Sequence, residues 1–389
     1  MRNLTGNVVE GDDFFERPRD LARFRRELDN GGNLLLVAPR RVGKTSFALR
    51  LCETLRGAGW SAAAINVEAC EHEVDFAQLL IEAMRQAGLD ANWWNRATAL
   101  LAAVRKSLGK VSLGSVIDLD LGESADPTRG SLRQFLSSAF QQIEAGNRPA
   151  LIAIDELPEL LLHMKRQPDG PVRVEHLLKW LRWLRQSFHK SVHWIFLGSI
   201  GLDSFVEEHN LGKTVNDLTH MTLEPLTPDE AHVFLERLGA GARLSLDRPM
   251  RDAILQRIGW PIPYFLQILF HALVDLDRRP VKPADVDEAY NHLLSPESFG
   301  YFDTWRQRLE TQFTAADAAA CRTLLTATCA VPQGLPRERL LDALMAAAPA
   351  ADPAEVELRL ARLLLVLQRD GYLISQNGQY AFRSFLLRD

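Results

Sequence analysis

Leu34-Leu35-Leu36-Val37-Ala38-Pro39-Arg40-Arg41-Val42-Gly43-Lys44-Thr45-Ser46 joins an apolar run to a loop of small and basic residues. The apolar run predicts a buried strand. After the loop, apolar residues at Phe47, Leu49, Leu51 and Leu55 predict a helix that begins near Lys44. A strand, a loop and a helix N-terminus in this order bring backbone N–H groups and a cation together at one point. Such an arrangement binds anions.

The spacing from Ala38 to Lys44 and Thr45 fits the P-loop pattern, with Ala38 where the pattern usually has its first glycine. Gly43 is expected to let the backbone approach the phosphates of ATP, and Lys44 to reach the β- and γ-phosphate oxygens. The Thr45 hydroxyl is expected to ligate Mg²⁺. The predicted phosphate-binding residues are Pro39, Arg40, Arg41, Val42, Gly43, Lys44, Thr45 and Ser46.

A second informative stretch, Ala150-Leu151-Ile152-Ala153-Ile154-Asp155-Glu156, is a continuous apolar run that ends in two acids. A strand of this kind lies inside a parallel sheet and presents its last residues at the carboxyl edge, where ligands bind. We expect Asp155 to hold the Mg²⁺ shell and Glu156 to orient and deprotonate an attacking water. The predicted catalytic residues are Lys44, Asp155, Glu156 and Ser199.

Three further sites have two interpretations each. Val9 and Arg17 precede the first predicted helix, and both are expected to lie beside the base and sugar of a nucleotide. For Val9, a purely packing role is an equal alternative. Ser199 ends the predicted strand at residues 192–199, and its hydroxyl is expected either to bond the γ-phosphate or the attacking water, or to be a plain turn hydroxyl. Pro261 and Pro263 form a rigid kink that clamps an adenine ring or merely joins two helices.

The pattern of elements predicts an α/β fold with three parts. Buried strands at residues 34–37, 61–67, 150–156, 192–199 and 219–223 alternate with helices and form a parallel-sheet core over residues 1–223. A capping box at Thr227-Pro228-Asp229-Glu230 opens an all-helical lid over residues 224–295. Residues 296–389 contain three helices and a hairpin around Asn377-Gly378, which predicts a winged helix. Residues 111–121 alternate like a strand or hairpin of unassigned role.

The composition bears on the number of domains, the partners and the location of the protein. The chain has 389 residues, of which 47% are hydrophobic and 24% charged, so two or three globular domains are expected. A net charge of −5 creates no global positive field toward nucleic acid or acidic membranes. The four cysteines form no C-x-x-C pair and are expected to be buried, reduced thiols. Without an apolar leader or an 18-residue apolar run, we expect a cytoplasmic protein without membrane attachment.

The chain resembles the P-loop ATPases first recognised as abundant in archaea, which are grouped with the AAA+ and STAND classes. The matching residues are Asp13-Phe14-Phe15-Glu16-Arg17, Pro39 to Ser46, Ile154-Asp155-Glu156-Leu157, Gly198-Ser199, Trp260-Pro261-Ile262-Pro263-Tyr264, Asp370-Gly371-Tyr372-Leu373 and Phe382 to Arg388. The resemblance implies an ATPase domain, a lid and a C-terminal winged helix, with ATP and Mg²⁺ held between domain and lid. It also implies that Pro261 or Pro263 touches the adenine. Glu16 and Ser199 depart from the pattern, as a small residue usually precedes Arg17 and replication-initiator relatives have Asn at position 199.

Two functions follow from this resemblance and these motifs. The first is an ATP-hydrolysing molecular switch in which ATP closes the lid and winged helix on the core, with a protein partner or self-association. The second is a DNA-binding ATPase related to replication or transposition helpers. From Tyr301 to Asp389 the chain has ten Arg, no Lys and ten acidic residues, and the turn at residues 375–379 has no cation. Because strong phosphate binding normally needs a basic footprint, the switch is favoured over DNA binding.

Overall fold

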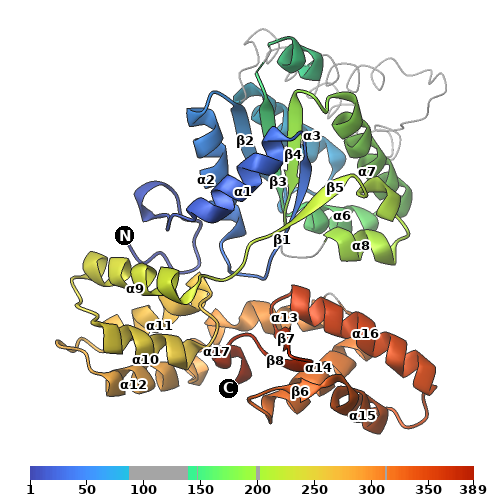
Figure 1. Cartoon of the computed structure of the whole chain (residues 1–389). Helices are drawn as coiled ribbons and strands as arrows, with labels where there is room; N and C mark the ends of the chain where they lie inside the picture. Colours follow the sequence, from blue (N-terminus) through green and yellow to red (C-terminus); the bar gives the residue numbers. More distant parts are fainter. Residues whose placement is uncertain (87–138, 147, 199–201, 312) are drawn as a thin grey trace. The chain divides into compact units, whose positions relative to one another are not determined.

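The computed structural model describes residues 1–86, 139–146, 148–198, 202–311 and 313–389 (Figure 1). These residues form two compact units. We call the first the sheet unit, and it comprises Glu16–Val37 and Lys44–Leu223. The second, the helical unit, comprises Met1–Phe15, Ala38–Gly43 and Glu224–Asp389. The predicted strand or hairpin at residues 111–121 lies outside the described residues, and the division into parts at 1–223, 224–295 and 296–389 stays a prediction.

A parallel sheet forms the centre of the sheet unit. Among the described residues it has five strands in the order β2-β3-β4-β1-β5. The strands are β1 (Asn33–Val37), β2 (Ser61–Asn66), β3 (Ala150–Asp155), β4 (Val192–Phe196) and β5 (Leu218–Thr222). Strands β3 and β4 are buried along their whole length, as the continuous apolar runs predict. All five predicted strands are therefore present.

The strand order separates the two motif-bearing strands. β4 pairs with β1 on one side, with Leu34 opposite Ile195, and with β3 on the other, with Ile154 opposite Phe196. Since neighbouring strands lie about 4.8 Å apart, β1 and β3 are about 10 Å apart at their carboxyl ends. Side chains that follow these two strands can meet across the end of β4.

Helices cover both faces of the sheet (Figure 1). On one face lie α1 (Pro18–Asp29) and α2 (Lys44–Gly57), where the Phe24 and Phe47 rings pack edge to face with centroids 4.9 Å apart. The other face is covered by α3 (Glu73–Gln86), α6 (Leu157–Lys165) and α7 (Gly170–Ser187), whose apolar residues share a core with the strands. The unit also contains α8 (Leu202–Glu208) and the turn η3 (Gly212–Thr214). Helix α6, which directly follows the acid pair, was not among the elements predicted from the sequence.

The helical unit begins with four helices after β5. They are α9 (Pro228–Ala242), α10 (Arg248–Ile258), α11 (Pro263–Asp275) and α12 (Pro283–Leu293). Both bonds of the predicted capping box are formed at α9, because the Thr227 side chain accepts from the Glu230 amide and the Glu230 carboxylate accepts from the Thr227 amide. Gly259, between α10 and α11, has φ +80°, and a side chain there would meet the Phe385 ring at 3.1 Å. The connection between α10 and α11 therefore requires glycine at position 259.

The C-terminal elements have the order of a winged helix. They are η4 (Pro296–Tyr301), α13 (Asp303–Thr311), α14 (Ala315–Cys329), β6 (Leu335–Pro336), α15 (Arg337–Ala347), α16 (Pro353–Arg369), β7 (Leu373–Gln376), β8 (Gln379–Phe382) and α17 (Phe385–Arg388). Asn377 and Gly378 have φ +51° and +76°, as a two-residue hairpin turn requires. Strand β6 adds a short third strand to this hairpin in the described part of the chain.

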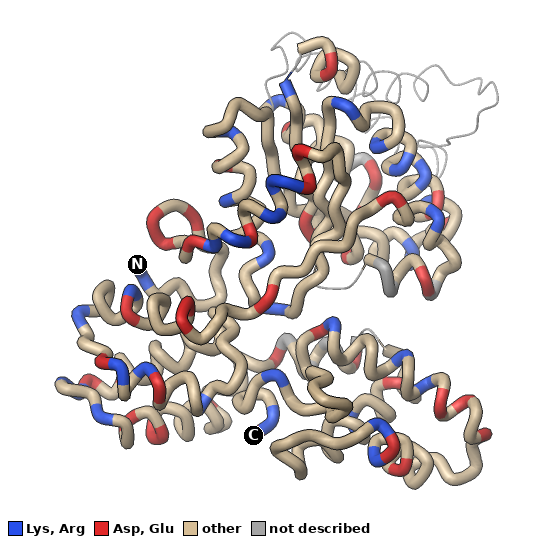
Figure 2. Tube along the Cα trace, in the orientation of Figure 1, with Lys and Arg blue, Asp and Glu red and all other residues tan. Residues whose placement is uncertain are grey.

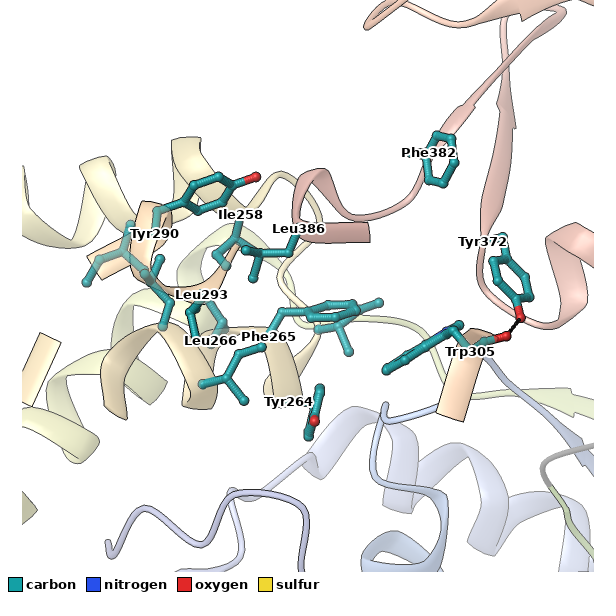
Figure 3. Close-up of a cluster of buried hydrophobic side chains, with 14 of the residues drawn as sticks. Ile258, Tyr264, Phe265, Leu266, Tyr290, Leu293, Trp305, Tyr372, Phe382 and Leu386 are labelled. Atoms are coloured by element: carbon teal, nitrogen blue, oxygen red, sulfur yellow. Dashed lines mark hydrogen bonds between the residues drawn. The ribbon is translucent and has the colours of Figure 1, made fainter. Parts of the chain in front are cut away.

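One hydrophobic core runs through the helical unit (Figure 3). The ring of Phe265, on α11, stacks on Trp305, on α13, with centroids 5.5 Å apart. Tyr372, just before β7, donates a hydrogen bond to the Trp305 carbonyl at 2.6 Å. The helices of the predicted lid and the predicted winged helix are therefore packed as one body. Within the described ranges, none of the helices is long and apolar enough to cross a membrane.

Candidate nucleotide-binding site

The side chains of Thr45 and Asp155 meet at the carboxyl edge of the sheet. Thr45, in the first turn of α2, donates a hydrogen bond to Asp155 Oδ2 at 2.5 Å. Asp155 is the last residue of β3, and α2 follows β1 after the loop, so this bond spans the end of the intervening strand β4. The sheet thus brings together two residues that are 110 positions apart in the sequence.

Burial dominates the electrostatics of Asp155. Its side chain is 6% exposed, and desolvation raises the pKa of the carboxyl from 3.8 to about 6. The Thr45 hydroxyl, the charge of the buried Lys44 and the Glu156 amide lower this pKa, whereas the charge of Glu156 raises it. A cation placed beside Asp155 would favour the ionised carboxylate, which is the form that a metal binds.

Glu156 has an unusual backbone conformation. Its φ of +59° lies in the left-handed region, which non-glycine residues adopt infrequently and often at functional sites. Its amide donates to Asp155 Oδ1 and to the Leu197 carbonyl, both at 2.9 Å. Pro158 starts α6 directly after it. Glu156 is thus held at the end of β3 by bonds to its own neighbour and to the segment after β4.

Gly198 lies against Glu156. A Cβ atom at position 198 would be 2.9 Å from Pro158 Cδ and 3.4 Å from Glu156 Oε2. The absence of a side chain at Gly198 therefore leaves room for the Glu156 carboxylate and for the first turn of α6. In the sequence, Gly198 was only part of a short match to other ATPases. Its neighbours in sequence do not show which distant atoms a side chain at position 198 would contact. Ser199, the next residue and a predicted catalytic group, lies outside the described residues.

The loop residues Ala38–Gly43 group with the helical unit. Arg41 has φ +64°, and its guanidinium lies over the Tyr264 ring at 4.7 Å from the centroid. Arg41 Nη1 is 3.5 Å from the Gly6 carbonyl. The Tyr264 hydroxyl donates to the Tyr301 carbonyl at 2.9 Å, which fixes the ring under the arginine. Arg41 is thereby positioned by α11 and not only by its own loop, a contact that the sequence analysis did not predict.

The remaining loop residues are tightly placed. Val42 is 2% exposed, and the backbone of Pro39 and Arg40 passes so close to Gly371 that a Cβ there would be 2.9 Å from Pro39 Cβ. Gly43 has φ +93°, with open space where a Cβ would lie. At position 43, glycine is therefore required by the backbone conformation. At position 371, it is required both by the backbone conformation and by the close approach of Pro39. Ser46, also a predicted ligand, is buried in α2.

The other predicted nucleotide contacts are distributed over both units. Arg17 is buried and pairs with Asp20 at 3.0 Å in the sheet unit. Val9 belongs to the helical unit, as do Pro261, whose carbonyl accepts from the Leu226 amide, and Pro263, which starts α11. The roles of these four residues toward a nucleotide stay predictions.

The donors present fit a magnesium ion. Mg²⁺ prefers oxygen ligands and is usually held by one or two protein oxygens together with phosphates and water. The Thr45 hydroxyl and the Asp155 carboxylate supply such oxygens side by side. Among the described residues, no cluster of three or more His, Cys, Asp and Glu side chains could hold a metal without phosphate. This donor set suits a metal that arrives with a nucleotide.

We compared the chain with protein-family models, curated sequences and solved structures. No family model and no curated protein sequence matches the chain. Its structure matches the Walker-type ATPase PABY2304 of Pyrococcus abyssi with a TM-score of 0.63 and 16% identity, over 99% of this chain and 97% of that one. The chain has the fold of an archaeal Walker-type ATPase. This ATPase fold also matches the ORC2 protein of Aeropyrum pernix, solved as ADPNP-ADP complexes, with a TM-score of 0.54 and 13% identity over 96% and 92% of the chains.

These matches confirm the predicted fold class and the predicted resemblance to archaeal P-loop ATPases. At 16% and 13% identity they describe the fold, so the roles of individual residues rest on the geometry given above. In this fold the loop at residues 38–46 follows the carboxyl end of β1, and Asp155 and Glu156 lie at the carboxyl end of β3.

Proposed function

We propose that the chain binds ATP with Mg²⁺ at residues 38–46 and hydrolyses it, and that it works as a molecular switch. The observation that carries this proposal is the hydrogen bond between Thr45 and Asp155, with the left-handed Glu156 directly beside it. A hydroxyl, an acid for the metal and an acid for the water converge at one edge of the sheet. The Walker-type ATPase fold supports the same conclusion.

Each side chain has a defined task in this proposal. Lys44, at the first position of α2, neutralises charge on the β- and γ-phosphates, and the N-terminus of this helix adds its dipole. Thr45 and Asp155 hold Mg²⁺, which supplies charge neutralisation across the phosphate oxygens. Glu156 accepts a proton from the attacking water and orients that water toward the γ-phosphate. Arg40 and Arg41 recognise the γ-phosphate.

The proposed switch is supported by the contacts of the loop at residues 38–43. Residues Ala38–Gly43 group with the helical unit, whereas Lys44 and Thr45 belong to the sheet unit. A nucleotide that reorders the loop therefore changes the contacts of Arg41 with Tyr264 and of Pro39 with the Gly371 backbone. Both contacts are to a body that carries the predicted lid and winged helix. Such differential contacts are what a ligand needs to shift a conformational equilibrium.

Two arginines near the C-terminus, Arg383 and Arg388, are candidates for pairing with an anionic group of the nucleotide or of a partner. The Arg383 guanidinium lies 4.9 Å from the centroid of the Trp260 ring, next to the Pro261 kink. Burial lowers its pKa and the nearby Glu224 raises it, while Nε and Nη1 are buried without a hydrogen-bond partner in the described part of the chain. Arg388, by contrast, pairs with Asp389 at 2.7 Å. We infer that Arg383 has the greater capacity to accept an anionic partner.

ATP turnover by the wild type, Lys44→Ala and Glu156→Gln tests the enzyme proposal. Glu156→Gln should lower kcat by about 100-fold or more while ATP still binds, because the general base is lost and the phosphate contacts remain. Lys44→Ala should weaken ATP binding itself. Glu175→Gln, an exposed acid on α7, is the matched control and should keep wild-type turnover. Lack of turnover in the wild type under all conditions would refute the proposal.

The same assays with duplex DNA address the second function. Figure 2 shows positions of basic residues interspersed with positions of Asp and Glu along the C-terminal elements, so basic residues do not follow one another along these elements as in a basic phosphate-binding segment. We therefore expect turnover to be unchanged by DNA and no gel shift at physiological salt. Stimulation together with a shift would replace the switch by a DNA-dependent ATPase.

A further inference from the structure

Helix α16 is apolar on two faces. One face packs into the core of the helical unit through residues at helical spacing, namely Val356, Leu360, Leu363, Leu364 and Leu367. The opposite face is exposed, yet it carries Leu358, which is 73% exposed, and Leu365, which is 42% exposed. An exposed apolar stripe opposite the core face of a helix indicates a second packing surface.

The exposed apolar residues form a continuous row. Ala354, Leu358, Ala361 and Leu365 are exposed and follow one another at intervals of four, three and four residues. This is the spacing of the seam of a two-stranded coiled coil. Single exposed leucines are ordinary on protein surfaces, but a row with this period marks a face that receives another helix.

Charges along the row make it self-complementary. Glu355 is exposed beside the N-terminal end of the row, and Arg369 ends the helix. In an antiparallel pair of α16 helices that crosses at Ala361, Leu358 of one copy faces Leu365 of the other, and Glu355 lies beside Arg369 of the other copy. A two-fold axis repeats each contact, as in other isologous interfaces. The small Ala361 at the crossing permits close approach of the helices.

The arginine nearest the axis is compensated within its own chain. Arg362 donates a hydrogen bond to Asp317 Oδ2 at 2.7 Å, and Arg359 lies 3.4 Å from Asp317 Oδ1. Asp317 is on α14, so these bonds draw both arginines toward their own unit. Like-charge repulsion between the two copies at the crossing is thereby reduced.

We propose that α16 is a self-association surface, on which a second copy of this chain packs its own α16 antiparallel along Ala354, Leu358, Ala361 and Leu365. The order of elements makes α16 the helix that a DNA-reading winged helix would place in the groove. The Leu358 side chain at its centre has no charge and no hydrogen-bonding group for a phosphate or a base edge, which favours a protein as the occupant. One helix pair covers less than the roughly 800 Å² per partner of a stable interface, so the dimer should be reversible in the micromolar range.

Sedimentation velocity of the full chain over a wide concentration range tests this surface. The wild type should shift from monomer to dimer with concentration, whereas Leu358→Glu should remain monomeric at every concentration. Val172→Glu, at an apolar position on α7 that is 53% exposed, is the control and should dimerise like the wild type. Thermal melting of each variant checks that it is folded.

Cysteine cross-linking tests the geometry. Cys52, Cys70 and Cys321 are buried, and burial raises the pKa of each thiol to about 11 or 12, so these three cysteines should react little. Cys329 is half-buried, so the wild type is treated in parallel to measure any cross-linking through it. Ala361→Cys lies near the proposed axis and should form a covalent dimer with a short bis-maleimide. Arg339→Cys, exposed on α15, is the control and should not. Glu355→Arg should weaken the dimer, and the added change Arg369→Glu should restore it.

Three outcomes would overturn the proposal. The first is a wild type that stays monomeric throughout, and the second is equal cross-linking at positions 361 and 339. The third is a duplex-DNA gel shift that Leu358→Glu abolishes, which would make α16 a DNA reader. ATP turnover is measured separately, so an inactive but dimeric chain would refute the proposed function and not this surface.

Discussion

The carboxyl group of Asp155 is buried beside Thr45, and this placement has a consequence for stability. Its pKa of about 6 in the folded protein exceeds the ordinary value of 3.8, because burial favours the neutral acid. The stabilising contribution is therefore complete below pH 4 and is lost as the pH rises through 6. At neutral pH the ionised carboxylate costs about 3 kcal/mol of folding free energy.

Asp155→Asn should accordingly change stability in a pH-dependent way. In the absence of nucleotide and Mg²⁺, the variant should be more stable than the wild type at pH 8, by up to about 3 kcal/mol, and similar to it at pH 4. The amide does not ionise and still accepts the bond from Thr45. Urea unfolding at the two pH values measures the difference, and an equal effect at both would show that Asp155 does not titrate as described.

Gly198→Ala tests the packing around Glu156. The added methyl group would come within 2.9 Å of Pro158 Cδ, so the start of α6 and the Glu156 carboxylate must shift. We expect kcat to fall about 10- to 100-fold with little change in ATP affinity, because only the water-activating group moves. Gly57→Ala, at the end of α2 in open space, is the control and should leave turnover unchanged.

At the scale of elements, the loop after β1 is fixed by helix α11. The contact of Arg41 with the Tyr264 ring belongs to a segment more than 200 residues further along the chain, which explains why the loop sequence alone did not reveal it. The ring in turn is held by its hydroxyl bond to the Tyr301 carbonyl. Loop order and the position of α11 are therefore linked.

Tyr264→Leu should weaken ATP binding about fivefold, since a cation–π contact of this kind contributes about 1 kcal/mol. Tyr264→Phe keeps the ring and should bind ATP nearly as the wild type does. Titration with a fluorescent ATP analogue measures both affinities. If the phenylalanine variant lost as much affinity as the leucine variant, the hydroxyl bond and not the ring would be the relevant contact.

At the scale of the whole molecule, the helical unit has one core that extends from α9 to the C-terminal hairpin. Trp305 is central to it, because its ring stacks on Phe265 and its carbonyl accepts from Tyr372 (Figure 3). The lid and the winged-helix elements should thus unfold together, and a nucleotide-driven movement should carry both.

Trp305→Ala should destabilise this unit by about 3–5 kcal/mol, as large-to-small changes in cores do. Hydrogen exchange should then accelerate in α11 and in β7–β8 together, whereas the parallel sheet keeps its protection. Phe299→Ala, at a position that is 51% exposed in the same unit, should change stability by less than about 0.5 kcal/mol. Loss of protection in β7–β8 alone would mean that the two parts are not one body.

The sequence by itself determined the local elements. The strand–loop–helix at residues 34–46, the capping box at Thr227, the Asn377-Gly378 hairpin and the acid pair after β3 all follow from periodicity, turn chemistry and capping, which act over a few residues. The fold class and the resemblance to archaeal ATPases followed from these. Strand β6 was missed because two residues carry no periodic pattern, and α6 because it follows the acid pair directly.

Only the tertiary structure decided which of these elements meet. The insertion of β4 between β1 and β3, the bond from Thr45 to Asp155, the glycine required at position 198 and the stacking of Arg41 on Tyr264 join residues that are distant in sequence. The exposed row on α16 could likewise be identified only from the structure, which shows that the other apolar face of this helix is buried in the core. Local patterns fix the conformation of a segment, whereas strand order and core packing depend on contacts whose partners no local pattern specifies.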